Sequence, residues 1–187
     1  MSAESSQGGL AGLADAQPVI SGDRLVLRPL HRQDAAALAR FVADRRVAEA
    51  TRSIPHPVPP GAVDAFIERA LARERGEDVW AMDGSGAGSA ALLGVISLKP
   101  LERQQGQIGY WVAPAFWNTG LASEAVRMIV SANPHGSRTL FAEVFQDNPV
   151  SARVLTKAGF EFIGDAEAWC VARSRAVPTW TYLRRMV

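Results

Sequence analysis

Hydrophobic and polar positions repeat along this chain with two different periods, which predict strands and helices. The run RLVLRPL at residues 24–30 alternates with a period of two, as expected for a half-buried strand. The same pattern predicts further strands at residues 79–82, 92–98, 107–113, 139–145, 161–164 and 179–184. Apolar residues three and four positions apart predict helices at residues 34–43, 62–75, 121–132 and 149–158. Because strands and helices alternate around a central hairpin, we expect an α/β domain with a mixed sheet.

Glycine and proline residues mark where several of these elements should end. Pro29 ends the first strand, and the proline-rich run SIPHPVPPG at residues 53–61 can form neither a helix nor a central strand. Gly76 is placed to stop the second helix. Asn148 followed by Pro149 is a favourable start for the last helix.

Two glycine-rich stretches are interpreted differently. Residues 1–18 are small and polar, so we expect a flexible tail there and a single domain over residues 19–187. Gly84, Gly86 and Gly88 are spaced like part of a dinucleotide-binding fingerprint. That fingerprint needs a helix directly after the glycines, and a β-type run follows here. We therefore interpret this stretch as a flexible hairpin turn.

The composition limits the classes of function. With 187 residues, 48% hydrophobic and 21% charged, the chain matches an ordinary globular domain. A net charge of +1 with dispersed basic residues gives no footprint for nucleic acid, and no apolar run is long enough to span a membrane. Cys170 is the one cysteine and cannot form an internal disulfide, which, without a secretory signal, predicts a cytoplasmic protein. The three histidines lack metal-ligand spacing, so we expect no metal site.

The segment at residues 116–122 joins a predicted strand to a predicted helix. Gly120 permits a positive φ or a close approach of the backbone, and Ala122 leaves the first helical turn uncrowded. The first acidic side chain after the turn is Glu124. Free main-chain N–H groups and the helix dipole at such a turn suit a phosphate or pyrophosphate. On local pattern alone, a plain strand–helix turn explains the segment at least as well.

A second group of polar residues begins the last predicted helix. Asn148 can cap that helix, Ser151 lies in its first turn, and Gly159 can end it. Any helix could use these residues in this way, so their spacing does not by itself indicate a binding site.

Together the two segments resemble a known family. QIGYWVAPAFWNTGLASEAV at residues 107–126 and EVFQDNPVSARVLTKAGF at residues 143–160 resemble the two signature blocks of the GNAT (N-acetyltransferase) superfamily, and more closely its RimJ/RimL-like branch. The similarity extends over residues 23–165. It implies a mixed, mostly antiparallel sheet of about seven strands, splayed between the fourth and fifth and flanked by about four helices.

The resemblance implies acetyl-CoA as co-substrate. Main-chain groups of Tyr110, Trp111 and Val112 would pair with the pantetheine arm in the slot left by the splayed strands. Asn148 would bind near the pantetheine or the acceptor, and Ser151 would lie near the sulfur. The pyrophosphate would be held at the bend formed by Trp117, Asn118, Thr119, Gly120, Leu121 and Ala122, chiefly by main-chain N–H groups.

The implied reaction is direct acetyl transfer to an amine, without a covalent enzyme intermediate. Ser151, Asn148 and Val112 form the predicted catalytic set, in which the Val112 N–H would stabilise the oxyanion. Many relatives carry a tyrosine acid seven residues after the motif asparagine, and here that position is Leu155. Ser151 is the natural substitute proton donor, with a plain hydrogen-bonding role in the helix as the alternative.

The general base has no clear assignment from the sequence. Family members often carry a glutamate just before the IGYW block, but here the residue is Gln107, which is no useful proton acceptor. Glu102, Glu143 and His56 are the candidates, and each also has a surface or structural interpretation. Deprotonation through water, with no single base, is a further alternative.

The acceptor amine is implied but not identified. The RimJ/RimL likeness suggests a protein N-terminus, whereas the superfamily also acetylates small amines such as amino acids, polyamines and antibiotics. The stretch AWCVARSRAVPTWTYLRRM at residues 168–186 departs from the usual ending of the family, so we favour a small or unknown acceptor. The alternative function is a catalytically silent CoA-binding sensor or interaction module. A monomer and a homodimer both fit the sequence.

Overall fold

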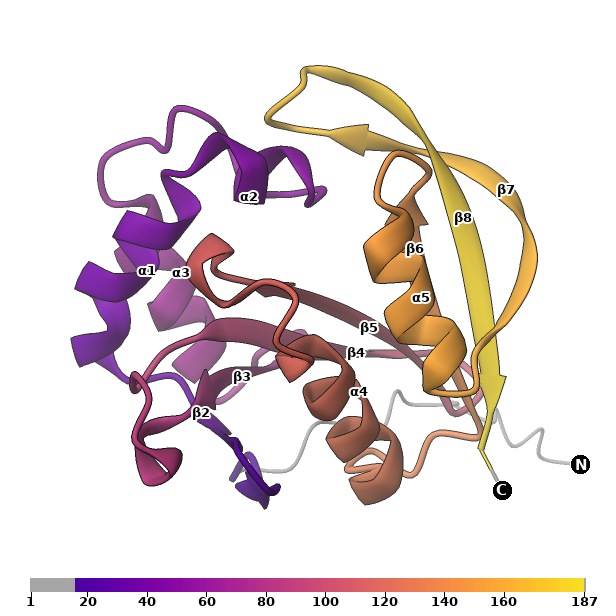
Figure 1. The fold of residues 1–187 in the computed structure, drawn as a ribbon, viewed down its shortest axis with the longest axis horizontal. Helices are drawn as coiled ribbons and strands as arrows, with labels where there is room; N and C mark the ends of the chain where they lie inside the picture. The colour runs from indigo at the N-terminus through magenta and orange to yellow at the C-terminus, as the bar shows by residue number, and fades with distance from the viewer. Residues whose placement is uncertain (1–15, 187) are drawn as a thin grey trace, which may run out of the picture.

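The computed structural model describes residues 16–186, which form one eight-stranded sheet and five α-helices (Figure 1). The sheet order is β1-β2-β3-β4-β5-β6-β8-β7, and neighbouring strands are antiparallel except for β5 and β6. The strands are β1 (Ile20–Ser21), β2 (Val26–Pro29), β3 (Asp78–Asp83), β4 (Gly94–Leu101), β5 (Gln105–Val112), β6 (Thr139–Phe145), β7 (Glu161–Cys170) and β8 (Arg175–Arg185). The helices are α1 (Ala35–Val42), α2 (Arg45–Glu49), α3 (Ala62–Leu71), α4 (Leu121–Ala132) and α5 (Pro149–Lys157).

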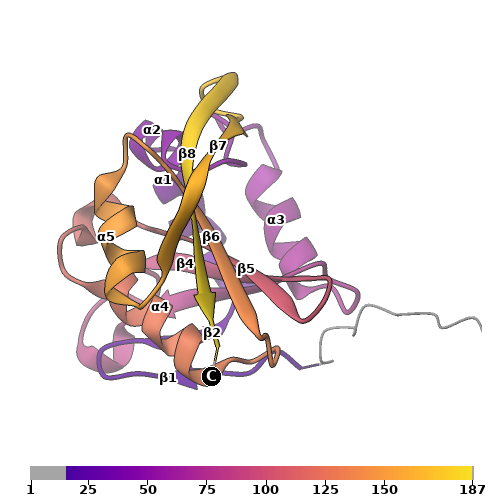
Figure 2. The ribbon, with the colours of Figure 1, turned by 90° about the vertical axis from the view of Figure 1, so that its right-hand side faces the viewer.

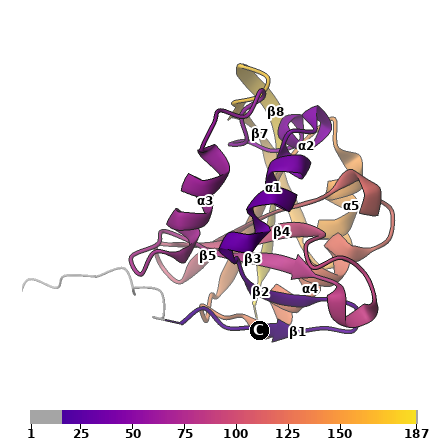
Figure 3. The ribbon, with the colours of Figure 1, turned by 90° about the vertical axis from the view of Figure 1, so that its left-hand side faces the viewer.

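Side chains of the central strands are buried alternately on the two faces of the sheet. On β3, Trp80 and Met82 belong to the main core, to which α4 and α5 contribute. Val79 and Ala81 face the other way and pack in a second cluster with side chains of α1 and α3. Figures 2 and 3 show these two helix pairs on opposite faces of the sheet. The mixed, mostly antiparallel α/β fold predicted from the sequence is therefore confirmed.

Three elements differ most in length from the prediction. α3 ends at Leu71 instead of continuing to residue 75, because residues 72–75 carry no large apolar side chain that a further turn could bury. β7 and β8 are both longer than predicted, since they pair from Glu161↔Leu183 to Cys170↔Arg175. Backbone pairing satisfies the N–H and C=O groups of this hairpin even where its side chains are polar.

The sequence pattern also missed β1 and α2, which are too short to show a period. Residues 84–88 connect β3 to β4 through a short 3-10 helix, Ser85–Ala87, and the element directly after them is the strand β4 and not an α-helix. Most of the predicted tail lies outside the described residues. At its end, Gln17 Nε2 donates to the Val79 carbonyl at 2.9 Å and Trp80 Nε1 donates to the Pro18 carbonyl at 2.7 Å. No helix between residues 16 and 186 is both long and apolar enough to cross a membrane.

Candidate functional site

The sheet opens between β5 and β6, its one parallel pair. Their register ends at Ile108↔Ala142, although β5 continues to Val112 and β6 to Phe145. β5 and β6 correspond to the fourth and fifth strands predicted from the sequence, between which the sheet was expected to splay apart. Beyond Ile108, the main-chain groups of each strand that face the other lack a ladder partner there, so a side chain, a turn, a ligand or water has to satisfy them.

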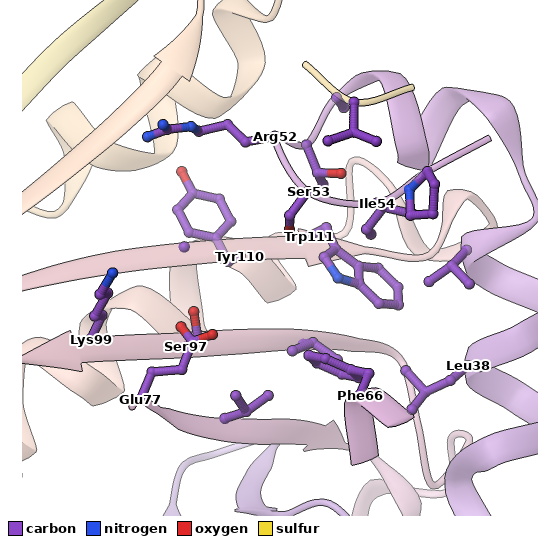
Figure 4. A pocket seen from close by; sticks show the side chains of 18 of the residues that line it. Leu38, Arg52, Ser53, Ile54, Phe66, Glu77, Ser97, Lys99, Tyr110 and Trp111 are labelled. Carbon is purple, nitrogen blue, oxygen red and sulfur yellow. The ribbon is translucent and has the colours of Figure 1, made fainter. Parts of the chain in front are cut away.

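Two cavities meet at this opening. The first, which we call the α5 cavity, has a volume of about 680 Å³ and is lined in part by Trp117, Asn148 and Ser151. The second, the α3 cavity, has a volume of about 810 Å³ and extends over the face of the sheet covered by α3 (Figure 4). The residues that line both cavities are Ala50, Ile108, Gly109, Tyr110, Trp111, Glu143 and Phe145.

The chain turns sharply between β5 and α4, as the sequence predicts. Asn118 and Gly120 have φ angles of 61° and 82°, which glycine adopts without strain and asparagine more readily than most residues. The first hydrogen bond of α4 joins the Glu124 N–H to the Gly120 carbonyl at 3.0 Å. Among residues 16–186, no acceptor takes the main-chain N–H groups of residues 118–122. These unpaired donors lie at one end of the α5 cavity.

The outer side of this bend is fixed by Arg24. Its Nη1 donates to the Thr119 carbonyl at 2.8 Å, and its Nε and main-chain N–H both donate to the Glu124 carboxylate at 2.8 Å. Burial opposes ionisation of Glu124, but these hydrogen bonds outweigh it and lower the pKa of the carboxyl below its usual value. The negative charge of Glu124, the first acidic residue after the bend, is therefore compensated by Arg24. Thr119 is the one residue of the predicted bend that does not line the α5 cavity.

Val112 directs its main-chain groups into the opening. Ala113 N–H donates to the Leu93 carbonyl at 2.8 Å on the β4 side, and successive residues of a strand point their main-chain groups to opposite sides. The Val112 carbonyl accordingly lies on the other side, where it accepts a 2.7 Å hydrogen bond from Trp117 Nε1. The Val112 N–H shares this direction. The Trp117 ring is in turn covered by the Arg46 guanidinium, 5.3 Å from its centroid.

The first turn of α5 faces β5 across the opening. The Asn148 side chain accepts from the Ser151 N–H at 3.2 Å and so caps the helix, as predicted. Ser151 Oγ donates to the Tyr110 hydroxyl oxygen at 2.9 Å, and that hydroxyl donates to the Ser151 carbonyl at 3.0 Å. Burial raises the pKa of Tyr110 far above its usual value, although the hydrogen bond with Ser151 acts in the opposite direction.

Cationic side chains line the α5 cavity. Arg153 and Lys157 lie one turn apart on α5, and neither forms an ion pair with any residue in the described part of the chain. Two further arginines of this cavity have acidic partners, since Arg173 pairs with Asp147 and Arg46 with Asp44. The unpaired charges therefore favour an anionic ligand on this side of the sheet.

The α3 cavity is mostly apolar, with a few charged groups. Figure 4 shows Trp111 and Phe66 within it and Arg52 above Tyr110. Arg52 Nη1 donates to Glu143 Oε2 at 2.6 Å, so this pair is neutral overall. The other charged residues that line the cavity are Arg69, Glu77 and Lys99.

The tip of the β7–β8 hairpin covers one side of the α3 cavity. Val171 N–H donates to the Arg52 carbonyl at 3.0 Å, and the Cys170 thiol is 3.3 Å from the Thr51 carbonyl. Trp169 and Val171 line the cavity at this point. Figure 1 shows the hairpin reaching toward the end of α2. Residues 168–186, whose sequence departs from the usual ending of the family, thus contribute to the wall of this cavity.

The match to a protein-family model shows which family this chain belongs to. The family model for the acetyltransferase (GNAT) domain matches residues 24–161. The chain belongs to the GNAT acetyltransferase family. An uncharacterized N-acetyltransferase of Bacillus subtilis (strain 168), YoaA, is 30% identical to it over 153 residues, which cover 77% of this chain and 83% of that protein.

Solved structures of GNAT acetyltransferases share the fold. RimL, a ribosomal L7/L12 alpha-N-protein acetyltransferase in complex with coenzyme A, has a TM-score of 0.75 at 18% identity, covering 90% of this chain and 98% of its own. Spermidine N-acetyltransferase from Vibrio cholerae, in complex with CoA and spermine, has a TM-score of 0.73 at 14% identity, covering 87% and 96%. At such identities the likeness concerns the fold.

In this GNAT domain, one of the three candidate general bases lies at the opening and the other two lie away from it. Glu143 lines both cavities at the opening. Glu102 lies in the exposed β4–β5 turn, and His56 is exposed in the proline-rich loop; neither lines a cavity. Leu155, at the position of the usual tyrosine, is fully buried in the main core.

For Tyr110 of this GNAT domain, the resemblance implied a main-chain role only. Its side chain is the group that reaches Ser151, and strand alternation alone could have placed it on the α5 face, opposite to Trp111. Arg24, Arg153 and Lys157 were also missed, because dispersed basic residues show no pattern before the chain folds.

Proposed function

We propose that this protein is an acetyl-CoA-dependent N-acetyltransferase of the RimJ/RimL-like branch, which moves the acetyl group directly to a primary amine. The observation that carries the proposal is the opening between β5 and β6, where the α5 and α3 cavities meet. One substrate can enter from each face of the sheet, and the two reacting groups come together at Gly109–Val112.

The α5 cavity has the donor groups that a CoA thioester needs. The unpaired N–H groups of residues 118–122 suit the pyrophosphate, and Arg153 and Lys157 add positive charge along α5. The unpaired edge of β5 suits the amides of the pantetheine arm, which would continue the sheet as an additional strand does. RimL and the Vibrio cholerae enzyme, which share the fold, were both solved with CoA.

Different groups at the opening would stabilise the oxyanion and protonate the leaving thiolate. Attack of the amine on the thioester carbonyl develops an oxyanion, and the inward-pointing Val112 N–H is placed to donate to it. Asn148 holds the first turn of α5 in position through its cap. The departing thiolate takes its proton from the hydroxyl pair formed by Ser151 and Tyr110.

Glu143 is the base that this geometry favours. It lies at the opening, and its hydrogen bond to Arg52 holds the carboxylate in place. An ammonium group entering from the α3 cavity would pass this carboxylate before it reaches the β5 edge, and its proton can leave through Glu143 or a water molecule bound there.

The acceptor that fits the α3 cavity is a small amine with an apolar body. Its wall is built from side chains such as Phe66, Trp111 and Trp169. Of its two carboxylates, Glu77 and Glu143, the second is already paired with Arg52, so the cavity offers little to a polyamine such as the spermine bound to the Vibrio cholerae enzyme. The hairpin tip also narrows access for a folded protein acceptor.

Calorimetry with acetyl-CoA, followed by assays of free thiol release, tests the proposal. We expect acetyl-CoA to bind and thiol to appear only when an amine is added, with aryl-alkyl amines preferred to spermidine and to peptides. Binding without thiol release from any amine would favour the alternative function, a silent CoA-binding module. No binding of acetyl-CoA would contradict both functions.

A further inference from the structure

Tyr110 reaches from β5 to the first turn of α5. Its hydroxyl accepts from Ser151 Oγ at 2.9 Å and donates to the Ser151 carbonyl at 3.0 Å. The side chain lines both cavities, and its ring packs against the main core. Figure 4 shows the ring rising from β5 away from the Trp111 indole. A phenol from a strand therefore stands at the point where the two cavities join.

The helix itself offers no equivalent group. Leu155, one turn after Ser151, is fully buried among apolar side chains. The Ser151 hydroxyl hydrogen is already directed at Tyr110. The Tyr110 hydrogen is likewise engaged, with the Ser151 carbonyl, and both hydroxyls can rotate. Turning the Tyr110 hydrogen toward another acceptor keeps the bond from Ser151 Oγ to the phenol, whereas turning the Ser151 hydrogen breaks it.

We infer that Tyr110 is the catalytic acid that protonates the CoA sulfur, and that Ser151 is a positioning residue that acts through Tyr110. The inference rests on the proposed function. It assigns to a β-strand residue the role that a helix tyrosine has in many relatives.

The step conserves protons and electrons. The amine nitrogen uses its lone pair to form the new C–N bond, and the C–S bond breaks with its electron pair remaining on sulfur. The Tyr110 O–H bond then breaks and its proton joins the sulfur, which leaves as the CoA thiol. The resulting phenolate regains a proton from water, which offsets the proton that the nitrogen releases to water or Glu143.

The protonation state of the phenol and its hydrogen bond from Ser151 both bear on this role. A phenol is protonated at neutral pH even in water, so the proton is present when the thiolate forms. Burial raises the pKa of Tyr110 further, whereas the hydrogen bond with Ser151 lowers it and so strengthens the acid. The hydrogen bond from Ser151 Oγ remains in place after the transfer and stabilises the phenolate. Removing Ser151 should therefore weaken the acid without abolishing it.

Substitution of each hydroxyl separates the two roles. Tyr110→Phe keeps the ring, and we expect kcat to fall about 100-fold or more while the Kd of acetyl-CoA changes little. Ser151→Ala should lower kcat about tenfold, and the double variant should match Tyr110→Phe, because Ser151 acts through the phenol. Tyr182→Phe is the matched control: it removes the one other tyrosine hydroxyl, which lies on β8 outside both cavities and acts on Tyr110 only by raising its pKa through charge, and it should change kcat little.

A second measurement uses bound CoA and needs no acceptor. The ultraviolet absorbance of the thiolate gives the pKa of the bound CoA thiol, and loss of a donor at the sulfur should raise that pKa in Tyr110→Phe but not in Tyr182→Phe. An unchanged thiol pKa, or a Tyr110→Phe enzyme with nearly normal kcat, would overturn the inference. If the unsubstituted protein transfers acetyl to no amine, the proposed function fails, and this titration still decides whether Tyr110 faces the sulfur.

Discussion

Gly94 on β4 lies directly against Trp111 on β5. A β-carbon on Gly94 would be 2.3 Å from the Trp111 carbonyl oxygen and 2.8 Å from the Val112 Cα. Both contacts are with backbone, which cannot move aside as a flexible side chain does. This close approach holds the end of β5, including Val112, in the position from which its N–H faces the opening.

Gly94→Ala is therefore expected to damage both stability and acetyl-CoA binding. Overpacking of this kind typically costs about 1–3 kcal/mol, and the strand end would shift away from β4. Urea unfolding and calorimetry measure the two effects. Gly86→Ala is the control, because a β-carbon there meets no atom within 4 Å, and it should change the free energy of unfolding by less than about 0.5 kcal/mol. Equal effects at both positions would contradict this account.

Trp117→Phe should weaken acetyl-CoA binding more than it weakens the fold. The substitution keeps a ring beneath Arg46 but removes the hydrogen bond from Nε1 to the Val112 carbonyl. A hydrogen bond of this kind contributes about 1 kcal/mol, so we expect the Kd to rise about fivefold. Calorimetry measures the change, and thermal unfolding checks that the fold is retained. A Kd equal to that of the unsubstituted protein would show that the bend does not depend on this bond.

Glu143→Gln should lower kcat about 100-fold if Glu143 receives the proton of the amine. Glutamine keeps the size of the side chain and can still bond to Arg52 through its oxygen, so the Kd of acetyl-CoA should change little. Glu102→Gln, in the exposed turn outside both cavities, should leave kcat near normal. Steady-state kinetics with the preferred amine compares the two variants. Similar kcat values would instead favour deprotonation through water alone.

Acid should destabilise the protein through buried carboxyl groups such as Asp34. Burial by itself would raise the pKa of Asp34, but hydrogen bonds from Arg28 and the His31 N–H outweigh it and lower the pKa. Because the folded pKa lies below the unfolded value of about 3.9, this stabilisation is complete well above pH 4 and is lost as the pH falls through the folded pKa. Asp78 and Asp83 also have lowered pKa values.

Urea unfolding at a series of pH values tests this dependence. The free energy of unfolding should fall between about pH 5 and pH 3, and Asp34→Asn should make the fall less steep while lowering stability at neutral pH. Asp64→Asn on the exposed side of α3 is the control and should preserve the slope. A slope in Asp34→Asn as steep as in the unsubstituted protein would refute the assignment.

Local sequence determined most of the elements and the order in which they occur. The period-two burial of residues such as Trp80 and Met82, the cap at Asn148 and the bend around Gly120 all follow from short-range physics. The resemblance of the two blocks located the opening between β5 and β6, and the register that ends at Ile108 confirms it.

Tertiary structure alone decided which side chains meet. Tyr110 and Ser151 are 41 residues apart, and Arg24 and Thr119 are 95 apart, so no local period could have paired them. The sequence pattern could not rank the three candidate general bases. Only the fold shows that Glu143 lies where the two cavities meet. Hydrophobic pattern fixes which face of a strand is buried, whereas contacts between distant polar groups depend on how the faces are packed together.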